Sequence, residues 1–270
     1  MARHLLRPAL NHYIHRVLFG ASAPLELVSG AMWDMIAQIP YLWQDYALES
    51  NPVTADGQDV GAWSESIGDL LQVAYSTVGY DGIYIANSNG YPAVRMADDS
   101  KYRGISGNEL DEPGGARTYH FVVSSSDAGV NSLFQHATTA QTSARFDVNN
   151  GAGAPKIVFG STPVTTFNTS AKISDGAIHV WTVTFYNHAT TDMDKHTCRI
   201  DGDDLGIASY TNGGTLVGWN EIFLGGDSAG SNMFNGDVHR VLAYNSVLSL
   251  ADQKQNEAAL GALYGVAITP

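Results

Sequence analysis

Three carboxylates lie close together in the run Asp201-Gly202-Asp203-Asp204. Calcium prefers such oxygen ligands, and an EF-hand loop starting at Asp201 would need Gly at its sixth position and Glu at its twelfth. Gly206 fits the sixth position, but the twelfth is Asn212, which cannot supply a bidentate carboxylate. Asp-Gly is also a strong signal for a hairpin turn. The run favours a hairpin over a calcium site, and Asp227 and Asp237 are further oxygen ligands to consider.

A neighbouring group of residues has the chemistry of a sugar site. Sugar recognition commonly uses an exposed aromatic ring together with amide and carboxylate partners. Tyr210, Asn212 and Trp219 flank a Gly-rich loop and could supply the ring and the amide. Trp219 has an alternative role, because aromatic side chains often cap the core of a sandwich. These three residues are the candidate glycan contacts.

Other reactive groups are few. The chain has one cysteine, Cys198, which excludes an internal disulfide framework and a Cys-rich zinc site. Cys198 lies in a strand pattern, so we expect a buried structural thiol and not a nucleophile. His12 and His15 are three residues apart with no acidic residue nearby, which favours surface or interface histidines over metal ligands.

The segments that must position these groups have the pattern of β-strands from about residue 40 onward. In 178–187, Trp181, Val183 and Phe185 alternate with polar or smaller residues and would share one face. The segment 236–245 alternates as well, and would place Val238, Leu242 and Tyr244 on one face. Further β-rich runs occupy 118–124, 143–149, 156–160 and 221–226.

Turn signals separate these runs at Asn150-Gly151, Asp175-Gly176, Asp201-Gly202 and Asn235-Gly236. Strands at a spacing of roughly ten residues, joined by such turns, predict an antiparallel sandwich or barrel.

Two segments outside the strands have helical spacing. Apolar residues recur at steps of three and four over 24–38, which predicts a helix that ends before Pro40. The segment 249–264 predicts a C-terminal helix on the rim of the sandwich, with Ser249 as its N-cap and Asp252 in a variant of the capping box. Its small apolar face would consist of Leu250, Ala258, Ala259 and Leu263.

Composition narrows the class of protein. Hydrophobic residues make up 44% of the chain, enough for a substantial core, while charged residues make up only 15%. The net charge of −13 speaks against general binding of nucleic acid, because that binding needs a basic face. No uncharged run reaches the 18 residues that would indicate a membrane span.

The first 20 residues differ in charge from the rest of the chain. They contain Arg3, Arg7 and Arg16 and no acidic residue, so they carry +3 while the other 250 residues carry −16, which gives the net charge of −13. An aliphatic stripe recurs at every fourth position and consists of Leu6, Leu10, Ile14 and Leu18. The polar residues between them interrupt the apolar run that a signal peptide needs. The segment fits a helix packed on its own domain, a docking or oligomerisation arm, or a helix on a membrane surface.

The segment 236–255 resembles the closing signature of concanavalin A-like lectin/glucanase domains of the laminin G and pentraxin type. That signature is a Gly-led strand, an aromatic-Asn pair, a Leu-Ser pair and an acidic helix start, matched here by Gly236, Val241, Tyr244, Asn245, Leu248 and Ser249. Upstream, 179–187 and 196–206 are similar to the family's paired central strands, 40–68 to its opening and 91–96 to the next strand. The resemblance covers roughly 40–265 and implies the jelly-roll fold, which does not fix a function.

The resemblance also carries functional expectations. Such domains without a secretion signal are similar to those of bacteriophage virion proteins, which decorate capsids, tails or fibres and can bind glycans. The glucanase branch uses carboxylates in a Glu-x-Asp-x-x-Glu pattern on one strand face. The nearest match is 109–114, where Gly114 replaces the last acid and Pro113 disfavours a central strand. We therefore expect no glycoside hydrolysis.

Together these observations predict an all-β antiparallel jelly-roll sandwich over 39–270, with a helical attachment arm over 1–38 and a short C-terminal helix. The leading interpretation is a non-enzymatic structural protein of a bacteriophage virion, made in the host cytoplasm, whose arm binds other virion proteins and whose chain forms a homo-oligomer. The alternative is a module that binds cell-surface carbohydrate, and a hydrolase ranks third. No cofactor is expected, with calcium the one candidate.

Overall fold

The computed structural model describes most of the chain from residue 82 onward and shorter stretches before it. The described residues are 26–30, 33–36, 56–57, 59–60, 62–64, 71–74, 82–97, 102–105, 116–137, 144–159, 164–186, 194–211, 221–227 and 232–270. Every strand pair among them is antiparallel, and the strands form two sheets. Within the described residues, no helix has the length and apolar character needed to cross a membrane.

The first sheet, called sheet A, has β18 and β8 near its centre, and β1 pairs with β18 beside the main path. In spatial order its strands are β15 (Asp203–Asp204), β14 (Thr197–Ile200), β13 (Ile178–Phe185), β8 (Arg117–Ser124), β18 (Gly236–Tyr244), β6 (Tyr91–Met96), β5 (Gly82–Ser88) and β2 (Asp59–Val60), with β1 (Trp33–Ile36) alongside.

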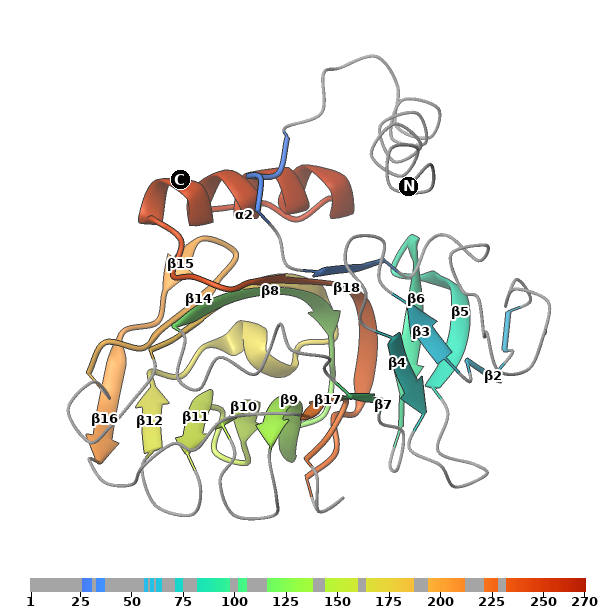
Figure 1. Ribbon diagram of the computed structural model, residues 1–270, viewed down its shortest axis with the longest axis horizontal. Helices are drawn as coiled ribbons and strands as arrows, with labels where there is room; N and C mark the ends of the chain where they lie inside the picture. The colour runs from blue at the N-terminus through green and yellow to red at the C-terminus, as the bar shows by residue number, and fades with distance from the viewer. Residues whose placement is uncertain are drawn as a thin grey trace.

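The second sheet, called sheet B, packs against one face of sheet A, and Figure 1 shows the helix α2 (Leu250–Tyr264) across the other face. In spatial order its strands are β16 (Ile207–Thr211), β12 (Val164–Phe167), β11 (Lys156–Phe159), β10 (Ala144–Asn150), β9 (Val130–Ala137), β17 (Glu221–Leu224), β7 (Tyr102–Ile105), β4 (Leu71–Ala74) and β3 (Ala62–Ser64). A short 3-10 helix, η2 (Ala171–Ser174), precedes β13. The predicted all-β antiparallel sandwich with a C-terminal helix is confirmed.

The core between the sheets is built from the faces that period-2 alternation predicted. Trp181, Val183 and Phe185 of β13 all lie in this core and are at most 2% exposed. The opposite face of β13 is buried too, because Ile178 and Val180 lie in a second apolar cluster with Leu260 and Tyr264 of α2. Sheet A is therefore covered on both faces along its central strands.

The predicted facing of β18 is wrong over half its length, and a β-bulge is the reason. The pairing of β18 with β8 shifts register between Val238 and Arg240, so one extra residue interrupts the alternation. Val238 then shares the main core with Val241 and Ala243. Leu242 and Tyr244 face the opposite way, into the cluster under α2.

Helix α2 begins as predicted, and its predicted apolar face is right at Ala259 and Leu263 but wrong at Leu250. Ser249 is the N-cap, and its hydroxyl accepts a hydrogen bond from the Asp252 backbone N–H. Leu250, predicted to lie on the apolar face, is 57% exposed. The helix also lies across the outer face of sheet A and not on the rim of the sandwich (Figure 1). Its buried residues are Gln253, Asn256, Glu257, Ala259, Leu260, Gly261 and Tyr264.

Polar groups on that buried face find partners in the sheet. The Asn256 amide donates to the Tyr244 hydroxyl at 2.9 Å and its carbonyl oxygen accepts from the Val28 backbone N–H at 2.8 Å. Glu257 accepts from Arg199 Nε at 2.9 Å, with both side chains buried. Helix α2 is thus held on sheet A by polar contacts as well as by Leu260 and Tyr264.

The helix predicted over 24–38 is contradicted by the described part of that segment. Residues 26–30 have no helical structure, and Trp33–Ile36 form the strand β1. Strand β1 pairs with β18, and Arg240 of β18 forms a buried ion pair with Asp34. Residues 33–36, assigned by the sequence to the attachment arm, therefore belong to sheet A. The division into 1–38 and 39–270 otherwise stays a prediction, because 1–25 lie outside the described residues.

Candidate functional site

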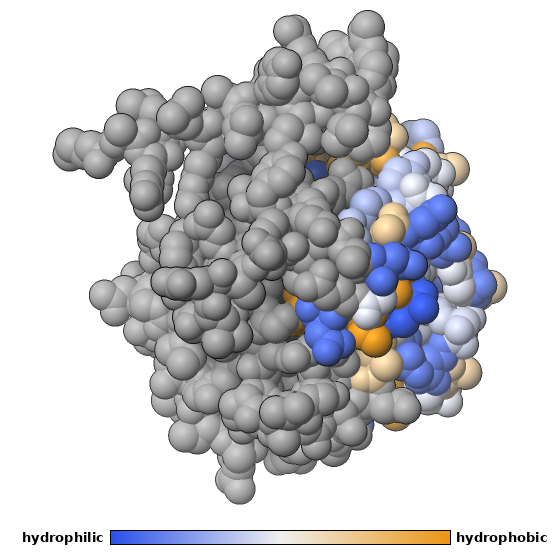
Figure 2. Space-filling model, turned by 90° about the vertical axis from the view of Figure 1, so that its right-hand side faces the viewer, coloured by the Kyte–Doolittle hydropathy of each residue, from blue (hydrophilic) through white to orange (hydrophobic). Residues whose placement is uncertain are grey.

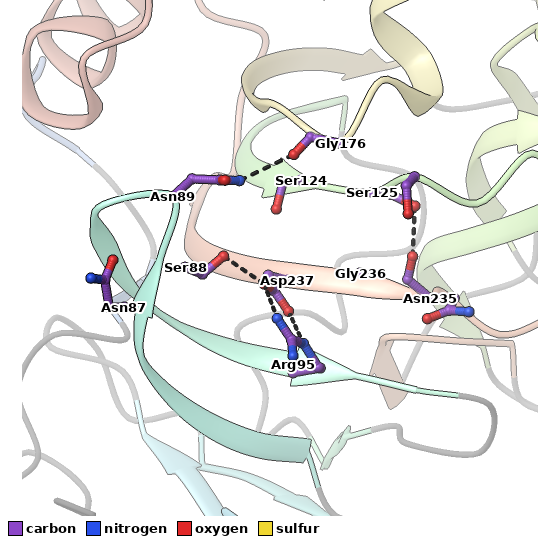
Figure 3. Close-up of a pocket in the computed structure, with 11 residues that line it drawn as sticks. Asn87, Ser88, Asn89, Arg95, Ser124, Ser125, Gly176, Asn235, Gly236 and Asp237 are labelled. Carbon is purple, nitrogen blue, oxygen red and sulfur yellow. Dashed lines mark hydrogen bonds and ion pairs between the residues drawn. The ribbon is translucent and has the colours of Figure 1, made fainter. Parts of the chain in front are cut away.

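A polar pocket of about 380 Å³ opens at one end of sheet A (Figure 3). It lies where β5, β6, β8 and β18 end or begin, and the turn before β13 closes one side. Its lining consists of hydroxyls, amides, backbone and one ion pair, contributed by Asn87, Ser88, Asn89, Arg95, Ser124, Ser125, Ser126, Gly176, Asn235, Gly236 and Asp237.

The Asp237 carboxylate is the centre of the pocket's hydrogen bonds. Arg95 donates to it from Nε at 2.7 Å and from Nη2 at 2.9 Å, and the Ser88 hydroxyl donates at 2.5 Å. Burial raises the pKa of Asp237, but the hydrogen bonds from Arg95 and Ser88 outweigh it, so the net pKa lies below the usual range. The hydrogen bond to Asp237 in turn raises the pKa of Arg95. Asp237 therefore stays ionised at neutral pH and is held in one orientation.

Strand register brings these side chains together. Asp237 of β18 is directly opposite Arg95 of β6 on one side and Ser124 of β8 on the other. Residues directly opposite in an antiparallel pair point to the same face. Val94 and Val238, their chain neighbours, point into the core, so the row of Arg95, Asp237 and Ser124 points outward. This is the face of sheet A on which α2 lies further along the strands.

Three turns hold the walls of the pocket. The tight turn between β5 and β6 places Asn89 and Gly90 at positive φ, and the Asn89 amide donates to the Gly176 carbonyl at 3.1 Å. The Ser125 hydroxyl donates to the Asn235 carbonyl at 2.6 Å. At Gly236, a Cβ would lie 2.3 Å from the Ser124 carbonyl oxygen, so only glycine permits this close approach of β18 and β8.

A charged network supports the Asp175-Gly176 turn from behind. His179 contacts the Asp201 carboxylate through Nδ1 at 2.7 Å and the Asp175 carboxylate through Nε2 at 2.9 Å. The Lys172 ammonium of η2 lies 3.4 Å from the Asp201 carboxylate and 2.9 Å from the Asp203 carboxylate. Burial lowers the pKa of His179, but its hydrogen bonds to the two carboxylates raise it by more, so the net pKa is raised. The network ties the pocket's turn to the hairpin between β14 and β15.

The carboxylates proposed for calcium take other partners. Asp201 and Gly202, at φ 52° and 86°, form the turn of the hairpin in which Ile200 pairs with Asp203, so the hairpin interpretation is confirmed. Asp204 accepts from the Gly206 backbone N–H at 2.9 Å. Among the residues that the structure describes, no three His, Cys, Asp or Glu side chains are grouped so that they could hold a metal ion.

The two other acids named from the sequence are also paired. Asp237 belongs to the pocket, and Asp227 accepts from Arg145 at 3.3 Å and from Asn232 at 2.7 Å. Cys198 is fully buried, and burial raises the pKa of its thiol well above the ordinary value, as expected of a structural cysteine.

The predicted glycan contacts are described only in part. Tyr210 lies on β16 at the edge of sheet B and is 48% exposed. Asn212 and Trp219 lie outside the described residues, so the predicted group is untested. The same holds for the glucanase-like run 109–114 and for the candidate attachment residues Arg3, Leu6, Arg7, Leu10, Ile14, Arg16 and Leu18.

One further sequence pattern, Gly-x-Ser-x-Gly at 226–230, is the signature of a hydrolase nucleophile elbow. In such enzymes it forms a sharp turn from a strand into a helix. Here it follows β17 and leads to the strand β18, and Gly226 pairs antiparallel with Met233. The pattern therefore lies in a strand-to-strand connection, and this context does not support a nucleophile elbow.

Sequence reasoning did not assemble the pocket. Asp237 was considered only as an oxygen ligand, while Arg95 and Ser124 carried no local signal. The three come from positions far apart in the chain and meet only through the register of β6, β18 and β8. The resemblance predicted a strand over 91–96 and alternation predicted another over 236–245, but neither indicated which strands are neighbours.

The fold and the pocket define an antiparallel two-sheet β-sandwich with a polar surface site. Similar folds occur in solved structures. A Trypanosoma rangeli sialidase matches with a TM-score of 0.53 and 12% identity, over 96% of this chain and 38% of its own. Domain 4 of AbnA, a GH43 extracellular arabinanase from Geobacillus stearothermophilus, was solved with arabinotriose. It matches with a TM-score of 0.52 and 16% identity, over 85% of this chain and 98% of its own.

A third structure, described as a mutant of HCR/D, matches with a TM-score of 0.52 and 10% identity, over 86% of this chain and 51% of its own. At these identities the likeness concerns the fold alone. This chain spans little more than a third of the sialidase's length. No protein-family model and no curated protein sequence matches the chain. The neighbours are compatible with the concanavalin A-like jelly roll and do not bear on its laminin G or bacteriophage aspects.

Proposed function

We propose that this chain is a carbohydrate-binding β-sandwich module and that the polar pocket on sheet A is its binding site. The observation that carries the proposal is the pocket's lining, in which the Asp237–Arg95 pair stands among serine hydroxyls and asparagine amides. Sugar hydroxyls both donate and accept hydrogen bonds, and this lining offers both kinds of partner. The arabinanase domain of similar fold, solved with arabinotriose, supports the carbohydrate class.

The described part of the face shown in Figure 2 agrees with a polar ligand. On the side shown in Figure 2, the described surface is mostly hydrophilic, with small and separate apolar spots. A docking surface for an apolar partner would need a contiguous apolar patch. Among the described lining residues no side chain is aromatic, so recognition would rest on hydrogen bonds and not on stacking. We therefore expect a weak affinity for a single site, roughly millimolar.

A glycan array tests the proposal. The full chain is labelled, presented multivalently to compensate for weak single-site affinity, and applied to immobilised saccharides that include arabinotriose. We expect reproducible binding to a subset of saccharides, competed by the same saccharide in solution. If the protein is folded by circular dichroism and binds none of the saccharides, the proposed function is contradicted.

As a second candidate, we propose that the chain is attached to a bacteriophage particle through its N-terminal arm. The observation that favours it is the charge difference between the basic first 20 residues and the acidic remainder, which would draw the arm to an acidic surface on another virion protein or a second copy. Deletion of 1–20 should leave a folded β-domain that no longer oligomerises or joins its particle. Assembly at wild-type occupancy after the deletion would contradict this role of the arm.

We also propose that the chain does not cleave polysaccharide, because Gly114 stands where the glucanase pattern has its last acid. Incubation with polysaccharides should release no reducing ends. Reproducible release that is abolished by Glu109→Gln would show that the chain is an enzyme.

A further inference from the structure

The hydroxyl of Ser124 has no hydrogen-bond partner among the residues that the structure describes, although Ser124 is only 6% exposed. In Figure 3 it points toward β18, the strand that carries Asp237. Ser88 and Ser125, two other serines of the pocket, both donate hydrogen bonds within the protein. This hydroxyl lines the pocket and is not among the buried side-chain atoms that lack a partner, so a hydroxyl of a ligand in the pocket can reach it and form the hydrogen bond.

Asp237 lies directly opposite Ser124 across the β18–β8 pair, so their Cβ atoms are about 4.5–5.5 Å apart. A carboxylate has about four acceptor positions, and Arg95 and Ser88 together occupy three of those of Asp237. The remaining acceptor position and the Ser124 hydroxyl form a pair that two neighbouring hydroxyls of one ligand can satisfy.

The charges around this pair disfavour an acidic ligand. Among the described lining residues, Arg95 and Asp237 are the charged ones, and they neutralise each other. Asp56 raises the pKa of Arg95 through its negative charge, and Asp127 adjoins the lining residue Ser126. Asp175 adjoins Gly176, but His179 contacts its carboxylate at 2.9 Å. His239, which faces Asp237, has its pKa lowered by burial and adds no positive charge at neutral pH.

Resting on the proposed carbohydrate function, we infer that the pocket selects an uncharged saccharide unit, whose adjacent hydroxyls bond to Ser124 and Asp237. A carboxylate, sulfate or phosphate on that unit would meet a site whose only lining cation among the described residues is already paired with Asp237, with Asp56 and Asp127 nearby. The chain's overall charge of −13 adds to the repulsion at low ionic strength.

The test compares matched neutral and acidic saccharides on one array. Neutral oligosaccharides, arabinotriose among them, are printed beside the same chains carrying sialic acid, a uronic acid or sulfate. We expect binding to neutral saccharides, loss of binding when an acidic group is added to the bound unit, and little change when salt is raised from about 50 to about 500 mM, because screening acts on charged pairs. Binding only to acidic saccharides would overturn the inference while leaving the carbohydrate function standing. Binding to none would overturn the function itself.

Point variants then locate the site. Ser124→Ala should weaken binding of the best neutral saccharide about 3- to 10-fold, the effect of losing one hydrogen bond, without changing the melting temperature. Ser209→Ala, the same change at an exposed position of β16, is the matched control and should bind like wild type. Equal affinity of Ser124→Ala and wild type, or weakening only in Ser209→Ala, would place the saccharide elsewhere and overturn the inference.

Discussion

Replacing Glu257 by leucine should destabilise the protein strongly, because it leaves the Arg199 charge buried without its counter-ion. Glu257 is fully buried and Arg199 is 5% exposed, and Arg199 donates to both carboxylate oxygens at 2.9 and 3.2 Å. After the substitution, the Gly202 carbonyl would be the acceptor left to the guanidinium among the residues that the structure describes. Breaking a buried ion pair from one side costs about 3–5 kcal/mol, a large share of the roughly 5–15 kcal/mol that stabilises a domain.

Urea denaturation followed by tryptophan fluorescence measures this cost, since Trp181 lies in the core. Lys254→Met, an exposed change on the same helix, is the control and should stay within about 0.5 kcal/mol of wild type. Arg199→Met and the double variant Arg199→Met/Glu257→Leu complete a double-mutant cycle, and the double variant should be more stable than Glu257→Leu alone. If Glu257→Leu costs less than about 1 kcal/mol, or if the cost of the double variant equals the sum of the single costs, the buried Arg199–Glu257 pair does not contribute as proposed.

Three further changes test the core, a turn and the network behind the pocket. Phe185→Ala should cost about 3–5 kcal/mol in urea denaturation, and a cost near zero would contradict the facing of β13. Gly202→Ala should lower the melting temperature much more than Gly57→Ala. Both glycines have positive φ, but of these two only Gly202 has a neighbour that an added Cβ would meet, the Thr269 carbonyl oxygen at 2.1 Å; equal effects on the melting temperature would contradict this. His179 has a raised pKa, so the stability it contributes is complete below its unfolded value of about 6.5 and is lost as the pH rises through its folded value. His179→Gln should therefore cost more at about pH 6 than at about pH 8.5, and a cost independent of pH would argue against the charged network.

Local signals predicted the features that depend on local geometry. Alternation in 178–187 placed Trp181 and Phe185 in the core correctly because side chains of a strand alternate regardless of its neighbours. The Ser249 cap and the Asp201-Gly202 hairpin were predicted correctly because each depends on residues next to each other in the sequence. Conversely, the helix over 24–38 was wrong at residues 33–36, whose conformation is set by pairing with β18.

Features that depend on strand register could not be predicted from the sequence. The bulge beside Val238 shifts the facing of β18, and no turn residue or break in composition marks it. The buried face of α2 was predicted only in part, because Asn256 and Glu257 look solvent-exposed in the sequence and their partners Tyr244 and Arg199 lie on strands of sheet A. The pocket had the same difficulty, since Arg95 becomes part of a binding site only when β6 and β18 are known to be neighbours.

A structure of the full chain bound to the strongest-binding saccharide from the array would show directly whether the pocket on sheet A is the binding site. We expect saccharide in the pocket at the end of sheet A, with its hydroxyls within hydrogen-bond distance of Ser124 Oγ and the Asp237 carboxylate, and with Arg95 still paired to Asp237. Saccharide bound at another surface, such as that around Tyr210 on β16, with the pocket holding only solvent, would contradict it.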